Sequence, residues 1–327
     1  MSHFHIPPSW RLDEKNATPE KVYLNRRQIV RAMGLGGIAL TMPQIASASE
    51  SDEVNVSPAV GKRFADRFPA KRNDKFTLGE RTLTPENIAG AYSNFYEFTT
   101  AKDRVWQLAK DYPVDPWKVE VTGLVKKPRT LDLDDFFTRF PLEERLYRFR
   151  CVERWAMQVP WTGFPLKQLI DYLEPDPSAK FVRFTTVLDK KGMPGQKSQG
   201  WYPWPYVEAL RLDEARHELA FVTVGSYGHA LPMQHGAPWR LIVPWKYGYK
   251  SAKSLVAIEF TKKRPGTFWN DMQPREYGFY SNVEPEKPHP RWSQRWEEDI
   301  GTGETRETLL YNGYAEQVGS LYTGKEV

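Results

Sequence analysis

The chain offers few long stretches with helical periodicity, and proline interrupts it throughout. It has 26 prolines among 327 residues, and each proline removes a backbone donor and breaks the helical hydrogen-bond pattern. Aromatic residues make up 14% of the chain, and 12 tryptophans are spread along its length. This combination favours short strands joined by loops. The length suffices for one large domain or two, with an ample core.

Short alternating runs of apolar and polar residues predict strands, and two segments predict short helices. Acidic residues at the start favour a helix over 132–140, and a first-turn proline favours another over 165–173. We therefore expect an α+β fold with mixed β-sheets, short helices and long loops. Residues 50–75 and 264–327 lack clear periodicity and are expected to drape over this domain. The predicted strands cover residues 117–124, 181–186, 219–224, 239–243 and 255–260.

The first 48 residues have the order of an export signal. A twin-arginine box at 25–31 precedes an apolar run at 32–42 and an Ala-Ser-Ala cleavage site at 46–48. The apolar run is too short to span a bilayer. We expect residues 1–48 to be a twin-arginine signal peptide and 49–327 a single periplasmic domain. Removing the leader lowers the formal charge from +5 to +2, so the basic composition does not indicate a nucleic-acid partner.

Cys151 is the only cysteine of the chain and stands between Arg150 and Glu153. Neighbouring arginines should favour the thiolate, the form that binds soft metals. The alternative is that Cys151 is a small buried apolar residue, as most lone cysteines are. One cysteine can form no internal disulfide, and it excludes both a covalent haem site and zinc sites built on paired cysteines.

Two loops could contribute to a site. Residues 87–98 are aromatic with small polar residues, and residues 244–254 hold three lysines, a glycine and three aromatic residues. A basic loop between strands can bind a phosphate through cations and backbone N–H groups. Taken alone, each loop could equally be a packed or solvated surface loop.

The order of several motifs resembles the molybdenum-cofactor fold of the sulfite oxidase family. The resemblance covers most of the chain after the leader, and it implies a molybdopterin-binding oxidoreductase. One contrast with sulfite oxidases is expected: only about 67 residues follow Phe260, too few for the separate dimerisation domain that those enzymes place there, since a further domain usually needs more than 100. The motifs that carry the resemblance are residues 121–131, 148–153, 161–166 and 231–240, the last running on into 244–254.

Within the family, the chain is most similar to periplasmic catalytic subunits that reduce methionine sulfoxide in proteins. That likeness rests on the segments 94–98, 140–145, 244–248, 276–280, 289–293 and 312–315. It implies electrons from a haem-carrying membrane subunit, oxidised periplasmic proteins as substrates, and passage through the twin-arginine translocation machinery. Two alternatives stay open: a sulfite dehydrogenase that passes electrons to a cytochrome, and an exported binding protein without catalysis.

The resemblance implies that Cys151 is the protein ligand of molybdenum, with one molybdopterin per chain. Asn94 would lie close to the metal, and Glu153 would either relay protons or pair with Arg150 or Arg154. Related proteins commonly carry asparagine where this chain has Ser93 and His235. Trp245, Tyr247 and Trp292 are expected at the rim of the site. The implied cofactor contacts are Ser93, Asn94, Tyr96, Glu97, Thr186, His235, Arg240, Ser251, Ala252 and Lys253.

Overall fold

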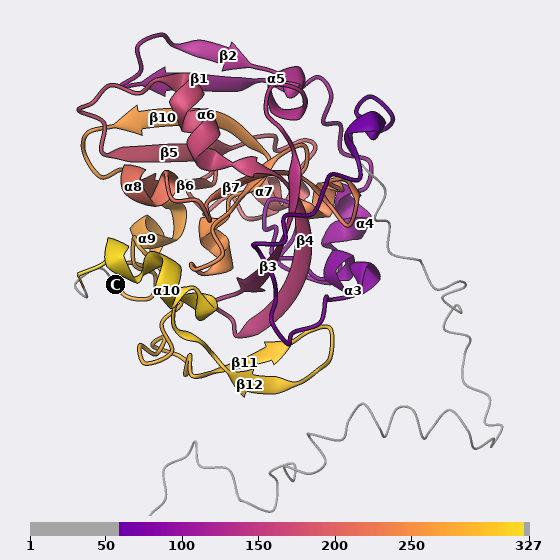
Figure 1. The fold of residues 1–327 in the computed structure, drawn as a ribbon, viewed down its shortest axis with the longest axis vertical. Coiled ribbons are helices and arrows are strands. Elements are labelled where there is room, and N and C mark those ends of the chain that lie inside the picture. The colour runs from indigo at the N-terminus through magenta and orange to yellow at the C-terminus, as the bar shows by residue number, and fades with distance from the viewer. Residues whose placement is uncertain (1–58, 324–327) are drawn as a thin grey trace, which may run out of the picture. The chain divides into compact units, whose positions relative to one another are not determined.

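The computed structural model describes residues 59–323, drawn in colour in Figure 1. The predicted export signal, residues 1–48, lies outside the described residues. None of the helices in the described part has the length and apolarity that crossing a membrane requires.

One mixed sheet holds three of the predicted strands. Its order is β2–β1–β10–β5–β6, with β1 parallel to β10 and the other pairs antiparallel. The predictions of strands over 117–124, 181–186 and 255–260 are confirmed within two residues at each end. The strands are β1 (Val119–Gly123), β2 (Arg129–Leu131), β5 (Phe181–Thr186), β6 (Val207–Arg211) and β10 (Leu255–Thr261).

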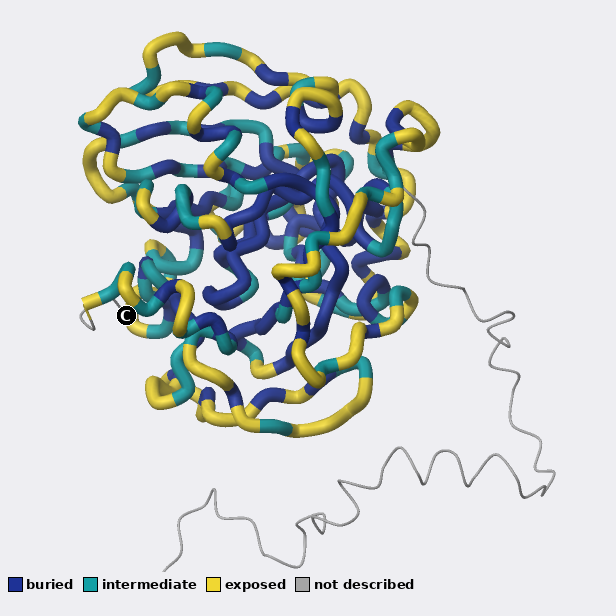
Figure 2. The backbone as a smooth tube through the Cα atoms, in the orientation of Figure 1, coloured by how far each residue is buried: buried dark blue, intermediate teal, exposed yellow. Residues whose placement is uncertain are grey.

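The second sheet runs through the most deeply buried part of the fold (Figure 2). Its order is β12–β11–β4–β7–β8, while β3 pairs with β4 and β9 with β7. The strands predicted over 219–224 and 239–243 correspond to β7 and β9. The bounds are β3 (Glu143–Arg150), β4 (Trp155–Pro165), β7 (Phe221–Ser226), β8 (His229–Ala230), β9 (Arg240–Ile242), β11 (Trp296–Asp299) and β12 (Thr305–Glu307).

Two expectations about this sheet need correction. The segment 264–327 does not merely drape over the domain, because β11 pairs in parallel with β4 and extends the sheet. Its buried positions are Glu297 and Asp299 rather than apolar residues, so a search for apolar alternation passes over it. The strand β4 was also missed, since ten of its eleven residues are buried and leave no alternation.

The helices are short. The two predicted ones are confirmed as α5 and α6, and Asp132 caps α5 by accepting from the backbone N–H of Asp135. The α-helices are α3 (Glu86–Ala91), α4 (Val105–Ala109), α5 (Leu133–Phe137), α6 (Leu166–Leu173), α7 (Pro194–Ser198), α8 (Leu212–Ala215), α9 (Phe268–Met272) and α10 (Ala315–Val318). The 3₁₀ turns are η3 (Ala65–Arg67), η4 (Met233–His235), η5 (Gly248–Lys250), η6 (Leu310–Gly313) and η7 (Gly319–Leu321).

Gly163 allows β4 and β7 to approach each other where their pairing shifts register. A Cβ at this position would lie 1.9 Å from the carbonyl oxygen of Val222. Gly163→Ala is therefore expected to lower the free energy of unfolding by about 1–3 kcal/mol, the usual effect of overpacking. Urea unfolding measures this change. Gly319→Ala is the control, because an added Cβ there meets nothing within 4 Å; equal stability losses in both variants would contradict the argument.

Candidate functional site

Cys151 occupies the turn of the hairpin formed by β3 and β4. Its backbone N–H donates to the carbonyl oxygen of Trp155 at 2.9 Å, and its own carbonyl accepts from Arg154 N–H at 3.0 Å. Arg154 adopts a positive φ of 76°, which turns the chain back into β4. The Glu153 N–H lies 3.4 Å from the Cys151 Sγ. The hairpin thus holds the sulfur at a fixed turn, with a backbone donor directed at it.

The segment before β11 holds this hairpin from the side away from the sulfur. Arg150 is fully buried, and its Nε donates to Glu297 Oε2 at 3.1 Å. Its Nη2 donates to Gln294 Oε1 at 2.9 Å, and its Nη1 donates to the Cys151 carbonyl. Gln294 and Trp292 both donate to the carbonyl oxygen of Val152, at 2.8 and 2.9 Å. The backbone of the turn is therefore fixed by residues at least 140 positions later.

The expectation that neighbouring arginines favour the thiolate is wrong for the protein without a bound cation. Burial raises the pKa of Cys151 to about 12, and the charge of Glu153 raises it further; the Glu153 N–H, Arg150 and Lys102 oppose this only in part. The Arg150 guanidinium is committed to Glu297 and to backbone oxygens. The thiol is neutral at pH 7 until a metal cation replaces its proton.

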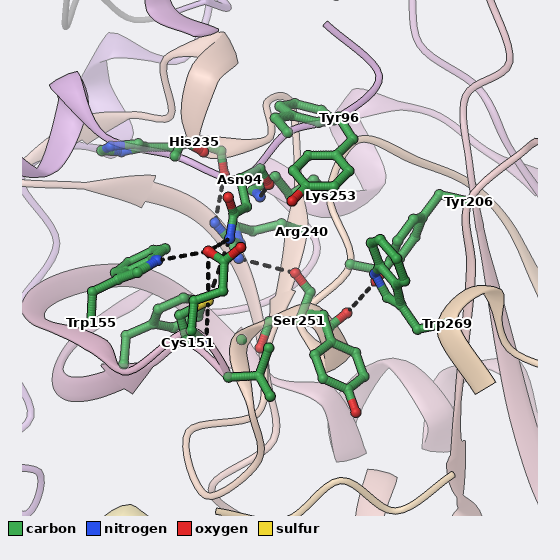
Figure 3. A pocket seen from close by; sticks show the side chains of 18 of the residues that line it. Asn94, Tyr96, Cys151, Trp155, Tyr206, His235, Arg240, Ser251, Lys253 and Trp269 are labelled. Carbon is green, nitrogen blue, oxygen red and sulfur yellow. Dashed lines mark hydrogen bonds between the residues drawn. The ribbon is translucent and has the colours of Figure 1, made fainter. Parts of the chain in front are cut away.

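Glu153 gathers the polar groups around the sulfur; two of its neighbours, Asn94 and Trp155, are labelled beside Cys151 in Figure 3. Its Oε2 accepts from Asn94 Nδ2 at 2.9 Å and from Trp155 Nε1 at 3.3 Å. Lys102 Nζ lies 3.3 Å from the same oxygen, so the ion pair of Glu153 is with Lys102 and not with Arg150 or Arg154. Asn94 Nδ2 also lies 3.3 Å from the Cys151 Sγ. Asn94 Oδ1 is buried without a hydrogen-bond partner.

A pocket opens over the Cys151 sulfur, with an empty volume of about 980 Å³ that includes its open side. Thr186 does not line it: this buried residue lies behind Tyr206, to whose carbonyl its N–H donates at 2.9 Å. The structure brings all the other predicted site residues together at the pocket wall. These are Ser93, Asn94, Tyr96, Glu97, Cys151, Glu153, His235, Arg240, Ser251, Ala252 and Lys253.

Arg240 and Lys253 place two buried basic side chains in the pocket wall, where the buried carboxyl of Glu97 interacts with Lys253 but not with Arg240. Among the described residues, the Arg240 guanidinium donates only to carbonyl oxygens, of His235 at 2.9 Å, Ser251 at 3.0 Å and Leu241 at 3.2 Å. Burial lowers the pKa of Arg240 to about 9. Burial, with the charge of Arg240, also lowers the pKa of Lys253. Because unpaired buried charge is costly, this wall favours an anionic group.

The other two lysines of the loop 244–254 are used inside the protein. Lys246 Nζ lies 2.6 Å from Glu214, and Lys250 Nζ lies 2.6 Å from Glu208; all four side chains are buried. These ion pairs anchor the loop and leave Lys253 facing the pocket. Gly236 makes room for it, since a Cβ there would lie 2.7 Å from Lys253 Cβ.

Apart from Tyr96, the aromatic residues of the pocket were not identified from the sequence. Trp245, predicted at the rim, is fully buried and donates to Tyr322 Oη at 2.7 Å. Tyr247 faces a neighbouring pocket, and Trp292 is committed to the Val152 carbonyl. The aromatic side chains that do line the site come largely from segments without periodicity. They are Tyr92, Phe95, Tyr96, Phe149, Trp155, Trp161, Tyr206, Tyr249, Phe268, Trp269 and Tyr277.

His235 gives the cofactor-free protein a pH-dependent stability. Burial, together with the charge of Arg240, lowers the pKa of His235 to about 3 from an ordinary value of 6.5. Between these values the unfolded chain binds a proton that the folded chain does not, so stability falls as pH falls, by about 1.4 kcal/mol per pH unit. In urea unfolding measured from pH 7.5 to 4.5, His235→Asn should reduce the slope of the free energy of unfolding against pH by about 1.4 kcal/mol per pH unit. Parallel curves for the two proteins would refute this assignment.

Comparison with known proteins identifies the fold. Residues 107–269 match the family described as "Oxidoreductase molybdopterin binding domain". Among solved structures, the chain resembles the sulfane dehydrogenase SoxCD from Paracoccus pantotrophus, with 15% identity and a TM-score of 0.41. That match covers 80% of this chain and 57% of that chain. The mixed sheets with short helices are those of the sulfite-oxidase-type molybdopterin-binding fold.

The pocket residues fit a molybdenum-molybdopterin group. Cys151 supplies a soft sulfur donor, and Arg240 and Lys253 supply cations suited to the molybdopterin phosphate. The unpartnered Asn94 Oδ1 can accept a hydrogen bond from a bound group. Within the described residues, no three His, Cys, Asp or Glu side chains cluster to hold a metal, so a metal at Cys151 would bring other ligands with it. Residues 107–269 thus match the oxidoreductase molybdopterin-binding domain family, and the pocket they line fits the molybdenum-molybdopterin group that this domain binds.

Proposed function

We propose that this oxidoreductase reduces methionine sulfoxide, protein-bound and free, to methionine. It would work in the periplasm after export through the twin-arginine route, and it would repair oxidised proteins there. Its electrons would come from a haem-carrying membrane subunit. The overall change adds two electrons and two protons to the sulfoxide and yields the thioether and water, reversing the first step of methionine oxidation.

The observation that carries this proposal is the lining of the pocket next to Cys151. Sulfite is a small dianion and would need cations around the reacting atoms. Next to the sulfur stands instead a carboxylate, Glu153, 3.7 Å from Cys151 Sγ, and among the described residues its ion pair is with Lys102 alone. Around them stand aromatic rings, among them Tyr92, Trp155 and Tyr277. Aromatic edges attract the sulfur and methyl group of a methionine side chain, so the lining favours an uncharged sulfoxide.

The bound cofactor supplies the two-electron chemistry, and the protein residues position the reactants. When the cofactor is bound, Cys151 would provide the protein sulfur donor, and Arg240 and Lys253 would hold the phosphate of the molybdopterin. Asn94 Nδ2 bridges the Cys151 Sγ and Glu153 Oε2, and so fixes the carboxylate relative to the sulfur. Glu153 is then placed to deliver protons to the oxygen that leaves as water. Lys102, 24% exposed, links that carboxylate to solvent.

Cys151→Ser should keep the fold and lose turnover. The serine hydroxyl is a hard donor that stays protonated, so it cannot replace a thiolate. We expect at least about a thousandfold lower kcat with methionine sulfoxide, which corresponds to roughly 4 kcal/mol of barrier. The unfolding midpoint of the cofactor-free variant serves as the control for folding. Substantial turnover by the variant would count against the proposed role of Cys151.

Lys253→Met should lower the molybdenum bound per chain several-fold, because one of two cations facing the phosphate is lost. Elemental analysis of protein produced with ample molybdate measures this content. Lys263→Met is the matched control, since Lys263 is exposed at the end of β10 and away from the pocket. Equal molybdenum content in both variants would show that Lys253 does not hold the cofactor.

Assaying methionine sulfoxide and sulfite side by side tests the proposed function. We expect turnover of the sulfoxide with a reduced dye and little oxidation of sulfite with an oxidised dye. The reverse pattern would establish the sulfite dehydrogenase instead. Wild-type protein with less than about 0.1 molybdenum per chain and a freely alkylated Cys151 would indicate a binding protein without catalysis.

A further inference from the structure

Trp201 is the most exposed large hydrophobic side chain among the described residues, with 73% of its surface accessible. It follows α7, in a segment of residues 188–204 that also contains Tyr202 and Trp204. Exposed tryptophan is unfavourable in water and is enriched at the energetic centres of protein interfaces. Its position therefore requires an explanation that the pocket alone does not give.

The segment is held firmly against the loop that carries Asn94 and Tyr96. Gln199 Nε2 donates to the Tyr96 carbonyl at 3.3 Å, and Trp204 Nε1 donates to the Gln199 carbonyl at 3.0 Å. A Cβ at Gly195 would lie 2.1 Å from the Tyr96 carbonyl oxygen, so the two backbones touch. A surface fixed in this way loses little entropy when a partner binds.

Aromatic contacts connect Trp201 with the pocket wall. Its ring centroid lies 5.6 Å from that of Tyr202, and the Tyr202 ring lies 6.4 Å from Tyr96 and 6.0 Å from Trp269. Tyr96 and Trp269 both line the pocket. We call Trp201, Tyr202 and Trp204, with Tyr96 and Trp269, the aromatic shelf. It runs without interruption from the protein surface to the opening over Cys151.

The same segment carries positive charge. Lys190, Lys191 and Lys197 are all exposed. The one carboxylate in the segment, Asp189, accepts from the N–H groups of Lys191 and Gly192 at 3.0 Å and from Tyr112 Oη at 3.2 Å. It offsets one of the three lysines, and the segment still presents a net positive charge to solvent.

We propose that the aromatic shelf and these three lysines dock an extended, acidic segment of the oxidised protein whose methionine sulfoxide enters the pocket. This inference rests on the proposed function. The aromatic shelf is continuous with the pocket, and this favours the substrate protein as the partner. A flexible chain that lies on the shelf can place one of its side chains in the pocket next to Cys151. An acidic chain satisfies the lysines, and its apolar groups cover the exposed indole.

The test compares two substrates with reduced benzyl viologen as the electron donor, so that no donor protein is needed. One is free methionine sulfoxide; the other is a synthetic peptide with a single methionine sulfoxide between glutamates. Trp201→Ala should raise the KM for the peptide about tenfold, equivalent to 1.4 kcal/mol of binding, with kcat unchanged. Kinetics with free methionine sulfoxide should not change. Trp296→Ala is the control, because Trp296 is 45% exposed on β11 and does not line the pocket.

The charge of the segment is tested with the triple variant Lys190→Gln, Lys191→Gln, Lys197→Gln. It should raise the KM for the glutamate peptide and weaken its dependence on salt, since screened ion pairs are lost. A peptide with glutamines in place of the glutamates should be unaffected by the three substitutions.

The outcomes separate the two proposals. Wild-type protein loaded with molybdenum that turns over neither substrate overturns the proposed function. Normal peptide KM values in both the tryptophan and the lysine variants, with free sulfoxide still reduced, overturn the shelf alone. Variants that lose binding to anionic phospholipid vesicles, or slow only with a protein electron donor, would assign the segment to a membrane or to that donor, and also overturn the shelf.

Discussion

The ion pair between Arg150 and Glu297 determines how the reactive turn is held. Both side chains are fully buried, and removing one partner of such a pair leaves an uncompensated charge that costs about 3–5 kcal/mol. Glu297 is shared further with Arg81 at 3.1 Å and with Arg306 at 3.0 Å. The pair joins β3 to β11 at the point where the Cys151 turn begins. The position of the turn therefore depends on both strands.

The alternation of side chains along β3 explains why the buried ion pairs around Glu297 leave the Cys151 sulfur free. Consecutive side chains of an extended chain point to opposite sides, so Arg150 faces the buried carboxylates while Cys151 faces the pocket. The loop 244–254 divides its residues in a similar way. Lys246 and Lys250 are used in buried ion pairs that anchor the loop, and Lys253 remains for the ligand. In both places, the groups that maintain the fold are separate from those that line the pocket.

The sequence predicted those parts of the molecule in which local pattern and environment agree. Strands β1, β5 and β10 alternate in the way their burial requires, and α5 begins at a capping Asp132. The motifs around Cys151, His235 and Arg240 correctly predicted that distant segments meet at one pocket. The strand β11 could not be recognised, because its inward residues are acidic and are stabilised by arginines from other segments.

Properties that depend on three-dimensional surroundings were also beyond the sequence. Because arginines are adjacent to Cys151 in the sequence, an ionised thiol was predicted. In the extended chain, however, the side chain of Arg150 points away from the side chain of Cys151. Burial therefore dominates and raises the pKa of the thiol. The pocket aromatics Tyr206 and Tyr277 come from connecting segments and Trp269 from the short helix α9, whereas Trp245 from the predicted rim is internal. The position of an aromatic residue in the sequence alone does not show whether its side chain lines the pocket or packs in the core.

The dependence of the Cys151 turn on Trp292, Gln294 and Glu297 also imposes an order on biosynthesis. A ribosome releases these residues well after the β3–β4 hairpin has emerged, so in a nascent chain the Cys151 turn lacks these supports until residues 292–297 have followed it.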